Sequence, residues 1–192
     1  TTLLQKYKSP EGAAALLYGV TGSGKTQVFL KLIEDVVNDG KGVIVMVPEI
    51  ALTPQMMSIF KGRYGENVAI FHSGLSAGER RDEYKRVFDK KAQIVVGTRS
   101  AVFAPFDDIG LFIVDEEHEN SYKSETSPRY HAIDVAEKRA KDEDSILLLA
   151  SATPSISEFY RAKQGEYTLF EMVKRYNQGA MPEVNIVDMR GE

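Results

Sequence analysis

The segment from Gly19 to Thr26 reads GVTGSGKT, and it decides the fold expected of this 192-residue chain. It matches the pattern G-x-x-x-x-G-K-[ST] at every fixed position. The apolar run 16–20 leads into it, and the amphipathic segment 25–38 follows it. A strand that passes through such a loop into a helix directs successive backbone N–H groups toward phosphate oxygens. The sequence therefore predicts a P-loop that binds a nucleoside triphosphate.

Each residue of this loop is a candidate contact for the nucleotide, which we expect to be ATP bound with Mg²⁺. The glycines allow the tight turn, and the start of the following helix adds the positive end of its dipole. Lys25 is expected to reach the β- and γ-phosphates, and Thr26 is expected to bind Mg²⁺. The candidate nucleotide-binding residues are Gly19, Val20, Thr21, Gly22, Ser23, Gly24, Lys25 and Thr26.

Short apolar runs alternate with segments of helical periodicity along the rest of the chain. The run 43–47 is nearly all β-branched, which is typical of a strand buried on both faces. The charged segment 77–89 is expected to be a surface helix, with Tyr84, Val87 and Phe88 facing the core. The alternation predicts an α/β fold, a mostly parallel sheet with helices on both faces. Further strands are predicted at 68–71, 94–96, 111–114, 146–150 and 167–170, and further helices at 52–61, 131–141 and 155–164.

The composition excludes several classes of protein. The formal net charge of -4 argues against a generally basic nucleic-acid binder, although local patches can still contact nucleic acid. The chain has no cysteine, so it holds neither a disulfide nor a cysteine-ligated metal. No apolar run reaches the length of a membrane helix, and the first ten residues lack a signal-peptide core. We expect a soluble, cytoplasmic protein that makes no membrane contact.

A second candidate site follows the apolar run 111–114, which ends in Asp115-Glu116-Glu117-His118. Hydrolysis at a P-loop also needs an acid at the end of a neighbouring strand. Asp115 is expected to hold Mg²⁺, through water, and Glu116 to orient and deprotonate the attacking water. Both sites would lie at the carboxyl ends of parallel strands, where such sheets bind ligands. Taken alone, these residues also fit a solvated acidic turn.

Several motifs resemble those of superfamily 2 helicases and translocases. The tetrad 115–118 has the D-E-x-H form, and 151–153 (SAT) follows a predicted strand as motif III does. The stretches 47–55 (VPEIALTPQ) and 97–105 (GTRSAVFAP) are similar to motifs Ia and Ib of the PriA family of replication-restart helicases (primosomal protein N′). The resemblance to this family extends over roughly 16–190 and includes 72–76, 121–123 and 129–132.

The resemblance implies the first RecA-like lobe of an ATP-dependent DNA helicase that moves 3′ to 5′ and restarts replication at stalled forks. The implied partners are single-stranded and forked DNA, other primosome proteins and single-stranded-DNA-binding protein. A second lobe would supply an arginine finger, so this piece is expected to hydrolyse ATP weakly or not at all. Zinc is expected only in a cysteine-rich module of the full-length protein.

The resemblance also assigns roles to single residues. Lys25 and Glu116 would be catalytic. His118 would couple the ATP site to the DNA face by contacting Ser151 or Thr153. The candidate DNA contacts are short polar side chains at strand ends, together with groups of an aromatic-rich loop expected to lack regular structure. They are Thr53, Gln55, Thr98, Arg99, Ser100, Tyr122, Arg129 and Tyr130.

Some of these assignments stay open from the sequence. Thr53 is equally suited to cap a helix, and Arg99 to pair with a carboxylate. Ile133 stands where the family has an arginine, and Pro128 where some members have a tryptophan. Base stacking would then fall to Tyr122 or Tyr130, or be weaker. Another superfamily 2 translocase of fork reversal or repair remains an alternative, as does a P-loop switch that moves no DNA.

The order of the elements weakens toward the carboxyl end. We expect residues 1–173 to form the ATP-binding lobe and 174–192 to be a linker toward a second lobe. The segment 184–187 could be a strand that leads elsewhere. The chain begins without Met and ends on Arg190-Gly191-Glu192, which suggests a piece of a longer protein.

Overall fold

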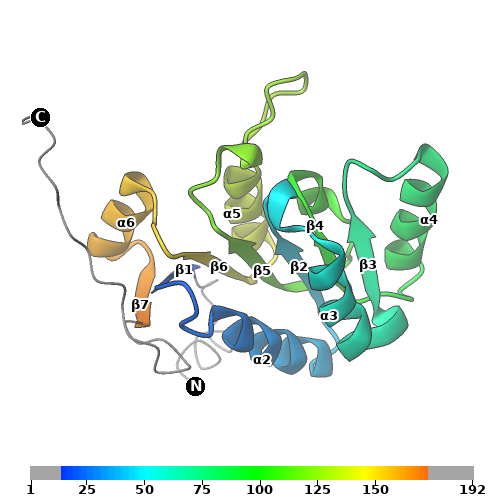
Figure 1. Cartoon of the computed structure of the whole chain (residues 1–192), viewed down its shortest axis with the longest axis horizontal. Coiled ribbons are helices and arrows are strands. Elements are labelled where there is room, and N and C mark those ends of the chain that lie inside the picture. The colour runs from blue at the N-terminus through cyan, green and yellow to red at the C-terminus, as the bar shows by residue number, and fades with distance from the viewer. Residues whose placement is uncertain (1–13, 173–192) are drawn as a thin grey trace, which may run out of the picture.

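The computed structural model describes residues 14–172, and within them seven parallel strands form one sheet (Figure 1). The order across the sheet is β3-β4-β2-β5-β6-β1-β7. Every neighbouring pair is parallel, so all the carboxyl ends lie along one edge of the sheet. The strands are β1 (Ala14–Gly19), β2 (Gly42–Met46), β3 (Val68–Phe71), β4 (Ile94–Gly97), β5 (Ile109–Asp115), β6 (Ile146–Ser151) and β7 (Thr168–Met172).

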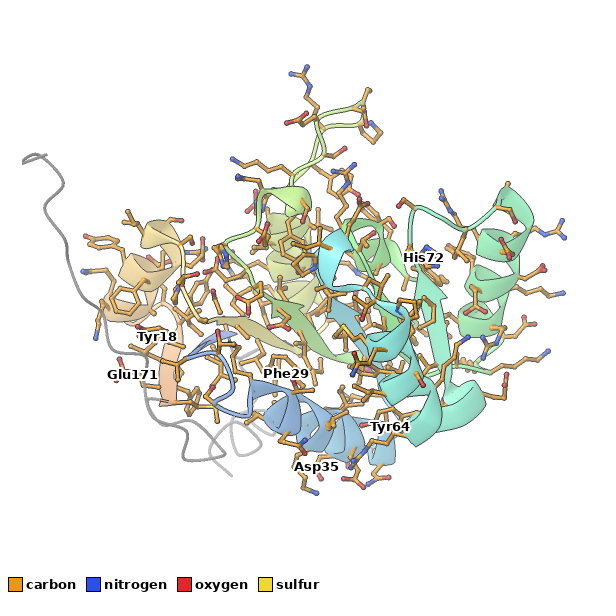
Figure 2. All side chains as sticks on the ribbon, viewed as in Figure 1. Tyr18, Phe29, Asp35, Tyr64, His72 and Glu171 are labelled. Atoms are coloured by element: carbon orange, nitrogen blue, oxygen red, sulfur yellow. The ribbon has the colours of Figure 1, made fainter. Side chains whose placement is uncertain are left out.

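Helices cover both faces of the sheet, as Figure 1 shows. One core layer lies under α2 and α3, and it contains Phe29 and Phe60. The other layer lies under α4, α5 and α6. Figure 2 shows Phe29 of α2 on the side of that helix that faces the sheet. It also shows Tyr64, which donates a 3.1 Å hydrogen bond to the Leu30 carbonyl, where α3 meets α2. The helices are α2 (Lys25–Asn38), α3 (Pro54–Tyr64), α4 (Ala77–Phe88), α5 (Ala132–Asp142) and α6 (Ile156–Lys163), with short 3₁₀ turns at Glu49–Ala51, Gly65–Asn67, Arg99–Phe103 and Asn120–Tyr122.

The strands are buried on both faces because their apolar side chains alternate between the two core layers. In β2, Val43 and Val45 join the layer under α2, while Ile44 and Met46 join the opposite layer. Gly97 at the end of β4 lies so close to β3 that an added Cβ would stand 2.2 Å from the Phe71 carbonyl oxygen. Position 97 therefore has no room for a side chain.

The fold class predicted from the sequence is confirmed, and the predicted strands and helices within residues 14–172 are present with small shifts at their ends. One predicted face is wrong. Val87 of α4 is buried, but Tyr84 and Phe88 are exposed, because only β3 packs closely against this edge helix. The predicted linker 174–192 and the strand predicted at 184–187 lie outside the described residues.

The register of the sheet places the P-loop and the acidic turn at the same height along the strands. Strand β6 lies between β1 and β5, so its end separates the P-loop from the acidic turn. Tyr18 pairs with Ser151, and Asp115 pairs with Ala150. The P-loop, the acidic turn and residues 151–153 therefore leave the sheet side by side.

Candidate functional site

The loop from Gly19 to α2 has the backbone shape that its glycines were expected to allow. Gly22 and Gly24 have φ angles of 78° and 94°, in the left-handed region that glycine adopts without a steric penalty. The Ser23 N–H donates a 2.9 Å hydrogen bond to the Val20 carbonyl, which closes the turn. Gly24 is the N-cap of α2, so the free N–H groups of the first helical turn face the loop.

Lys25 lies between this loop and the acidic turn. Its Nζ donates a 2.8 Å hydrogen bond to the Gly19 carbonyl and stands 3.8 Å from Glu116 Oε1. The Lys25 side chain is only 11% exposed, so its ammonium group is largely shielded from bulk water. The lysine that the sequence assigned to phosphate binding thus contacts the residue that it assigned as the base.

Asp115 ends β5 and has a perturbed acidity. Burial, and then the charge of Glu116, raise the pKa of its carboxyl from 3.8 to about 6. Lys25 and the hydrogen bond from the Glu116 N–H, 3.1 Å long, act in the opposite direction. Glu116 has a φ angle of 47°, a left-handed conformation that costs energy in a residue with a side chain. A strained acid beside a buried one is a common feature of functional sites.

A cavity of about 380 Å³ opens between the loop and the acids, lined by residues 20–27, Asp115 and Glu116. Among the described residues, the buried Ser23 hydroxyl has no hydrogen-bond partner. The hydroxyl of Thr26 and the carboxylate of Asp115 are oxygen donors of the kind that Mg²⁺ takes. Within residues 14–172, no three or more histidine, aspartate or glutamate side chains are arranged so that they could hold a metal ion by themselves.

Side-chain contacts connect the acidic turn to the end of β6. Glu116 Oε2 accepts hydrogen bonds from the Ser151 hydroxyl at 3.3 Å and the Ala152 N–H at 3.4 Å. His118 Nδ1 lies 2.8 Å from the same Ser151 hydroxyl. Of the two predicted partners of His118, the structure places Ser151 against it. Thr153 joins only through its backbone N–H, which donates to Ser151 Oγ at 3.0 Å, while its side chain is exposed.

Glu117 is a residue of the site that the sequence did not single out. It is 3% exposed, and its carboxylate accepts hydrogen bonds from the Ser155 N–H at 2.7 Å and the Ser155 hydroxyl at 3.0 Å. Ser155 in turn caps α6 through the Glu158 N–H. Burial raises the pKa of Glu117. Nothing in the sequence distinguishes it from the neighbouring acids, because its burial depends on α6, forty residues away.

The candidate DNA contacts at the strand ends divide into two groups. Thr53, Gln55 and Ser100 are exposed at the carboxyl edge of the sheet. Thr53 also caps α3, since its hydroxyl accepts the Met56 N–H at 3.2 Å. Thr98 is only 4% exposed, so its side chain is not available as predicted.

Arg99 holds the aromatic-rich loop, and among residues 14–172 it pairs with no carboxylate. Its Nη1 donates to the carbonyls of Lys123, at 2.7 Å, and Ser121, at 3.4 Å. Lys123 forms an antiparallel bridge with His131, and the residues between them project from the body as the narrow loop at the top of Figure 1. The loop otherwise lacks regular structure, as predicted, and its Arg129 is exposed.

The prediction that Tyr122 stacks on bases is wrong for this structure. The ring is 1% exposed, and its hydroxyl donates to the backbone carbonyls of Asp115 at 2.6 Å and Met46 at 3.2 Å. Tyr122 therefore joins the ends of β2 and β5 beneath the loop. Tyr130 is half-buried against Phe103, an exposed aromatic that the sequence did not single out.

Comparison with known proteins agrees with this geometry. A model described as DEAD/DEAH box helicase matches residues 3–162, most of the chain. The chain belongs to the DEAD/DEAH box helicase family. Its similarity to curated proteins of that kind is also high. It is 53% identical over 184 residues to the Replication restart protein PriA of Bacillus subtilis, covering 96% of this chain and 23% of that protein. It is 45% identical over 182 residues to PriA of Synechocystis, covering 92% and 22%. The chain thus spans about a quarter of the length of these curated relatives.

Solved structures support the same fold for this DEAD/DEAH box helicase. The chain has a TM-score of 0.61 and 27% identity to a DEAD box protein from Methanococcus jannaschii, covering 84% of this chain and 46% of that one. It has a TM-score of 0.60 and 20% identity to RecG bound to a three-way DNA junction, covering 88% and 22%. The RecA-like helicase fold expected from the motifs is confirmed. None of the helices between residues 14 and 172 is long and apolar enough to cross a membrane.

Proposed function

We propose that this chain is the ATP-binding motor lobe of a 3′ to 5′ DNA helicase that restarts replication at stalled forks. The observation that carries the proposal is the meeting of Lys25 and Glu116 across one cavity, with Glu116 in contact with Ser151. The second contact connects the nucleotide site to a segment that leaves it, as both a motor and a nucleotide switch require. The match to the DEAD/DEAH box helicase model favours the motor of these two.

Each group at the cavity suits one part of phosphoryl transfer. The loop N–H groups and Lys25 are suited to bind the phosphates, and Thr26 and Asp115 are suited to hold Mg²⁺. The ion, when bound, supplies charge neutralisation at the phosphates. Glu116 is the general base. Its Oε2 accepts from Ser151 and Ala152, while its Oε1 faces Lys25 and the cavity, so Oε1 is the oxygen that accepts the proton of the attacking water.

The connection from this site to DNA runs through residues 151–153 and the acidic turn. His118 and Glu116 both contact the Ser151 hydroxyl, so a change of charge at the nucleotide alters the hydrogen bonding at the end of β6. On the same edge of the sheet, the exposed Thr53, Gln55 and Ser100 are suited to phosphates of a single strand. Such contacts do not read bases, which suits a motor that moves over any sequence.

The partners and the cellular location belong to the same proposal, and they rest on the similarity to replication restart proteins. We propose forked DNA, other primosome proteins and single-stranded-DNA-binding protein as partners, and the cytoplasm as the location. The arginine finger would come from a second lobe, and zinc would bind elsewhere in the full-length protein. Ile133, where an arginine was expected, belongs to α5 and is only 3% exposed, so it cannot supply the charge that an arginine would offer to a phosphate.

Nucleotide titration tests the site. A Lys25→Ala variant is expected to lose binding of a fluorescent ATP analogue by at least about tenfold, because it loses a charge-assisted contact to phosphate. Glu116→Gln is expected to keep binding and, in the full-length protein, to abolish hydrolysis. The exposed Lys138, on α5, gives the matched control Lys138→Ala. Unchanged binding by the Lys25 variant would refute the phosphate role, and hydrolysis at the normal rate in Glu116→Gln would refute the base.

Single-stranded DNA tests the motor. The ATPase activity of the full-length protein is expected to rise when a single-stranded oligonucleotide is added. An ATPase that binds nucleotide normally but shows no response to DNA would favour the nucleotide switch over the helicase.

A further inference from the structure

Phe103 is exposed in a segment whose other apolar residues are buried. It lies at the end of the 3₁₀ turn Arg99–Phe103, and its side chain is 50% exposed. Ala101, Val102 and Ala104 on either side are at most 1% exposed. Leaving a large aromatic ring in water forfeits part of its hydrophobic stabilisation, so an exposed ring between buried neighbours marks a contact surface better than a scattered apolar residue does.

The backbone on both sides of Phe103 is fixed, so the ring cannot turn inward without breaking contacts. Arg139 Nη1 donates hydrogen bonds to the carbonyls of Val102 at 2.7 Å and Ala104 at 3.2 Å. Arg139 is itself held by Glu143 through a 2.9 Å contact. The two clamped carbonyls bracket Phe103, which is therefore presented on a rigid support.

A second aromatic ring lies beside it. The centroids of Phe103 and Tyr130 are 5.0 Å apart, and the ring planes meet at 72°. Tyr130 ends the projecting loop, and its carbonyl accepts the Ser124 N–H at 2.8 Å. Arg99, from the same 3₁₀ turn as Phe103, anchors the opposite side of that loop at Lys123. The two rings are thus held together from both segments.

The pair lies at the edge of the sheet where polar groups suited to phosphates are also exposed. Ser100 is exposed within the same turn, and Arg129 is exposed next to Tyr130. A surface with aromatic rings beside a guanidinium and a hydroxyl has the composition of a binding site for single-stranded nucleic acid. Bases stack on aromatic rings with little preference for sequence, which suits the same ligand.

We propose that Phe103 and Tyr130 form a stacking site for a base of single-stranded DNA. The inference rests on the proposed function. It keeps Tyr130, one of the two stacking candidates from the sequence, and puts Phe103 in place of the other, the buried Tyr122. The base packs on the exposed surface of Phe103, and Tyr130 supports that ring from its edge. Arg129 and Ser100 contact the neighbouring phosphates.

The test separates bases from phosphates. The 192-residue chain is titrated into two fluorescently labelled oligonucleotides of equal length, one of thymidines and one whose sugars carry no base. Phe103→Ala is expected to weaken binding to the thymidine strand by about tenfold, the lower part of the range for one stacked base. Its binding to the abasic strand is expected to stay within twofold of the unmodified chain. Phe103→Tyr is expected to restore the thymidine affinity.

Phe88→Ala is the matched control, since Phe88 is also an exposed ring. It lies on α4 and lines the pocket around Gly42, at the opposite edge of the sheet. It is expected to bind both strands normally. Equal weakening of both strands by Phe103→Ala, or no weakening of either, would overturn the stacking site while leaving the proposed function intact. If the unmodified chain binds neither strand, the DNA-binding part of the proposed function fails, and the stacking site fails with it.

Discussion

Replacing Asp115 with asparagine is expected to make this protein more stable, although it removes a residue of the candidate ATP site. The side chain keeps its size and loses its charge. In the folded protein, burial and the neighbouring Glu116 raise the pKa of Asp115 from 3.8 to about 6. Because the unfolded chain keeps the ordinary value, the folded state binds a proton more readily than the unfolded state does. Ionisation of Asp115 therefore opposes folding.

The size and pH dependence of the effect follow from that shift. The stability associated with a protonated Asp115 is full below about pH 4 and is lost as the pH rises to about 6. Two pKa units at about 1.4 kcal/mol each give a cost of about 3 kcal/mol near pH 7.5. Asparagine does not ionise, so Asp115→Asn is expected to gain about 3 kcal/mol near pH 7.5 and about half of that near pH 5.

Thermal unfolding followed by circular dichroism measures this gain. For a chain of this length, about 3 kcal/mol corresponds to a rise in Tm of about 6–12 °C near pH 7.5. Asp82→Asn is the control, because the Asp82 side chain on α4 is 71% exposed and its charge costs the fold little. A Tm that is unchanged or lowered near pH 7.5, or a gain of the same size at both pH values, would refute the reasoning. A confirmed gain would show that the protein keeps a destabilising carboxylate at the position suited to Mg²⁺.

Substitutions at two further positions, each with a control, test the packing of the fold. Glu117→Ala is expected to lower the free energy of unfolding by about 2 kcal/mol, because two charge-assisted hydrogen bonds from Ser155 are lost. Removal of the buried charge acts in the opposite direction and is included in this net value. Glu117→Gln keeps one acceptor and should lose about half as much in urea denaturation; equal losses would contradict the role of the hydrogen bonds. Gly97→Ala is expected to cost about 3 kcal/mol or more, because the new Cβ would stand 2.2 Å from the Phe71 carbonyl oxygen. Gly78→Ala, within α4 and facing open space among the described residues, is expected to gain about 0.5–1 kcal/mol, and a similar result for both glycines would contradict the steric explanation.

The elements were predictable from the sequence where one pattern on consecutive residues determines them. The P-loop needs its glycines and lysine at fixed spacing, and the left-handed φ angles of Gly22 and Gly24 follow from that pattern. The strands that are buried on both faces are continuous apolar runs, which a parallel sheet requires. The face of α4 was harder to predict because an edge helix packs against few neighbours, so its periodicity overstated the burial of Tyr84 and Phe88.

By itself, the sequence determined the α/β fold and the family, and it predicted the side chains of the candidate nucleotide site, because a phosphate-binding loop is a pattern of adjacent residues. Only the tertiary structure decided which groups are buried and which meet. It buries Tyr122 under the loop that was expected to expose it, and it leaves Phe103 exposed between buried neighbours. It also pairs Glu117 with Ser155 and Glu116 with Ser151. The physical reason is that burial depends on what distant segments cover, and a local pattern carries no information about that. The P-loop from Gly19 to Thr26 is thus predictable as a binder of phosphates, while its contact with the acids and β6 is a property of the folded sheet.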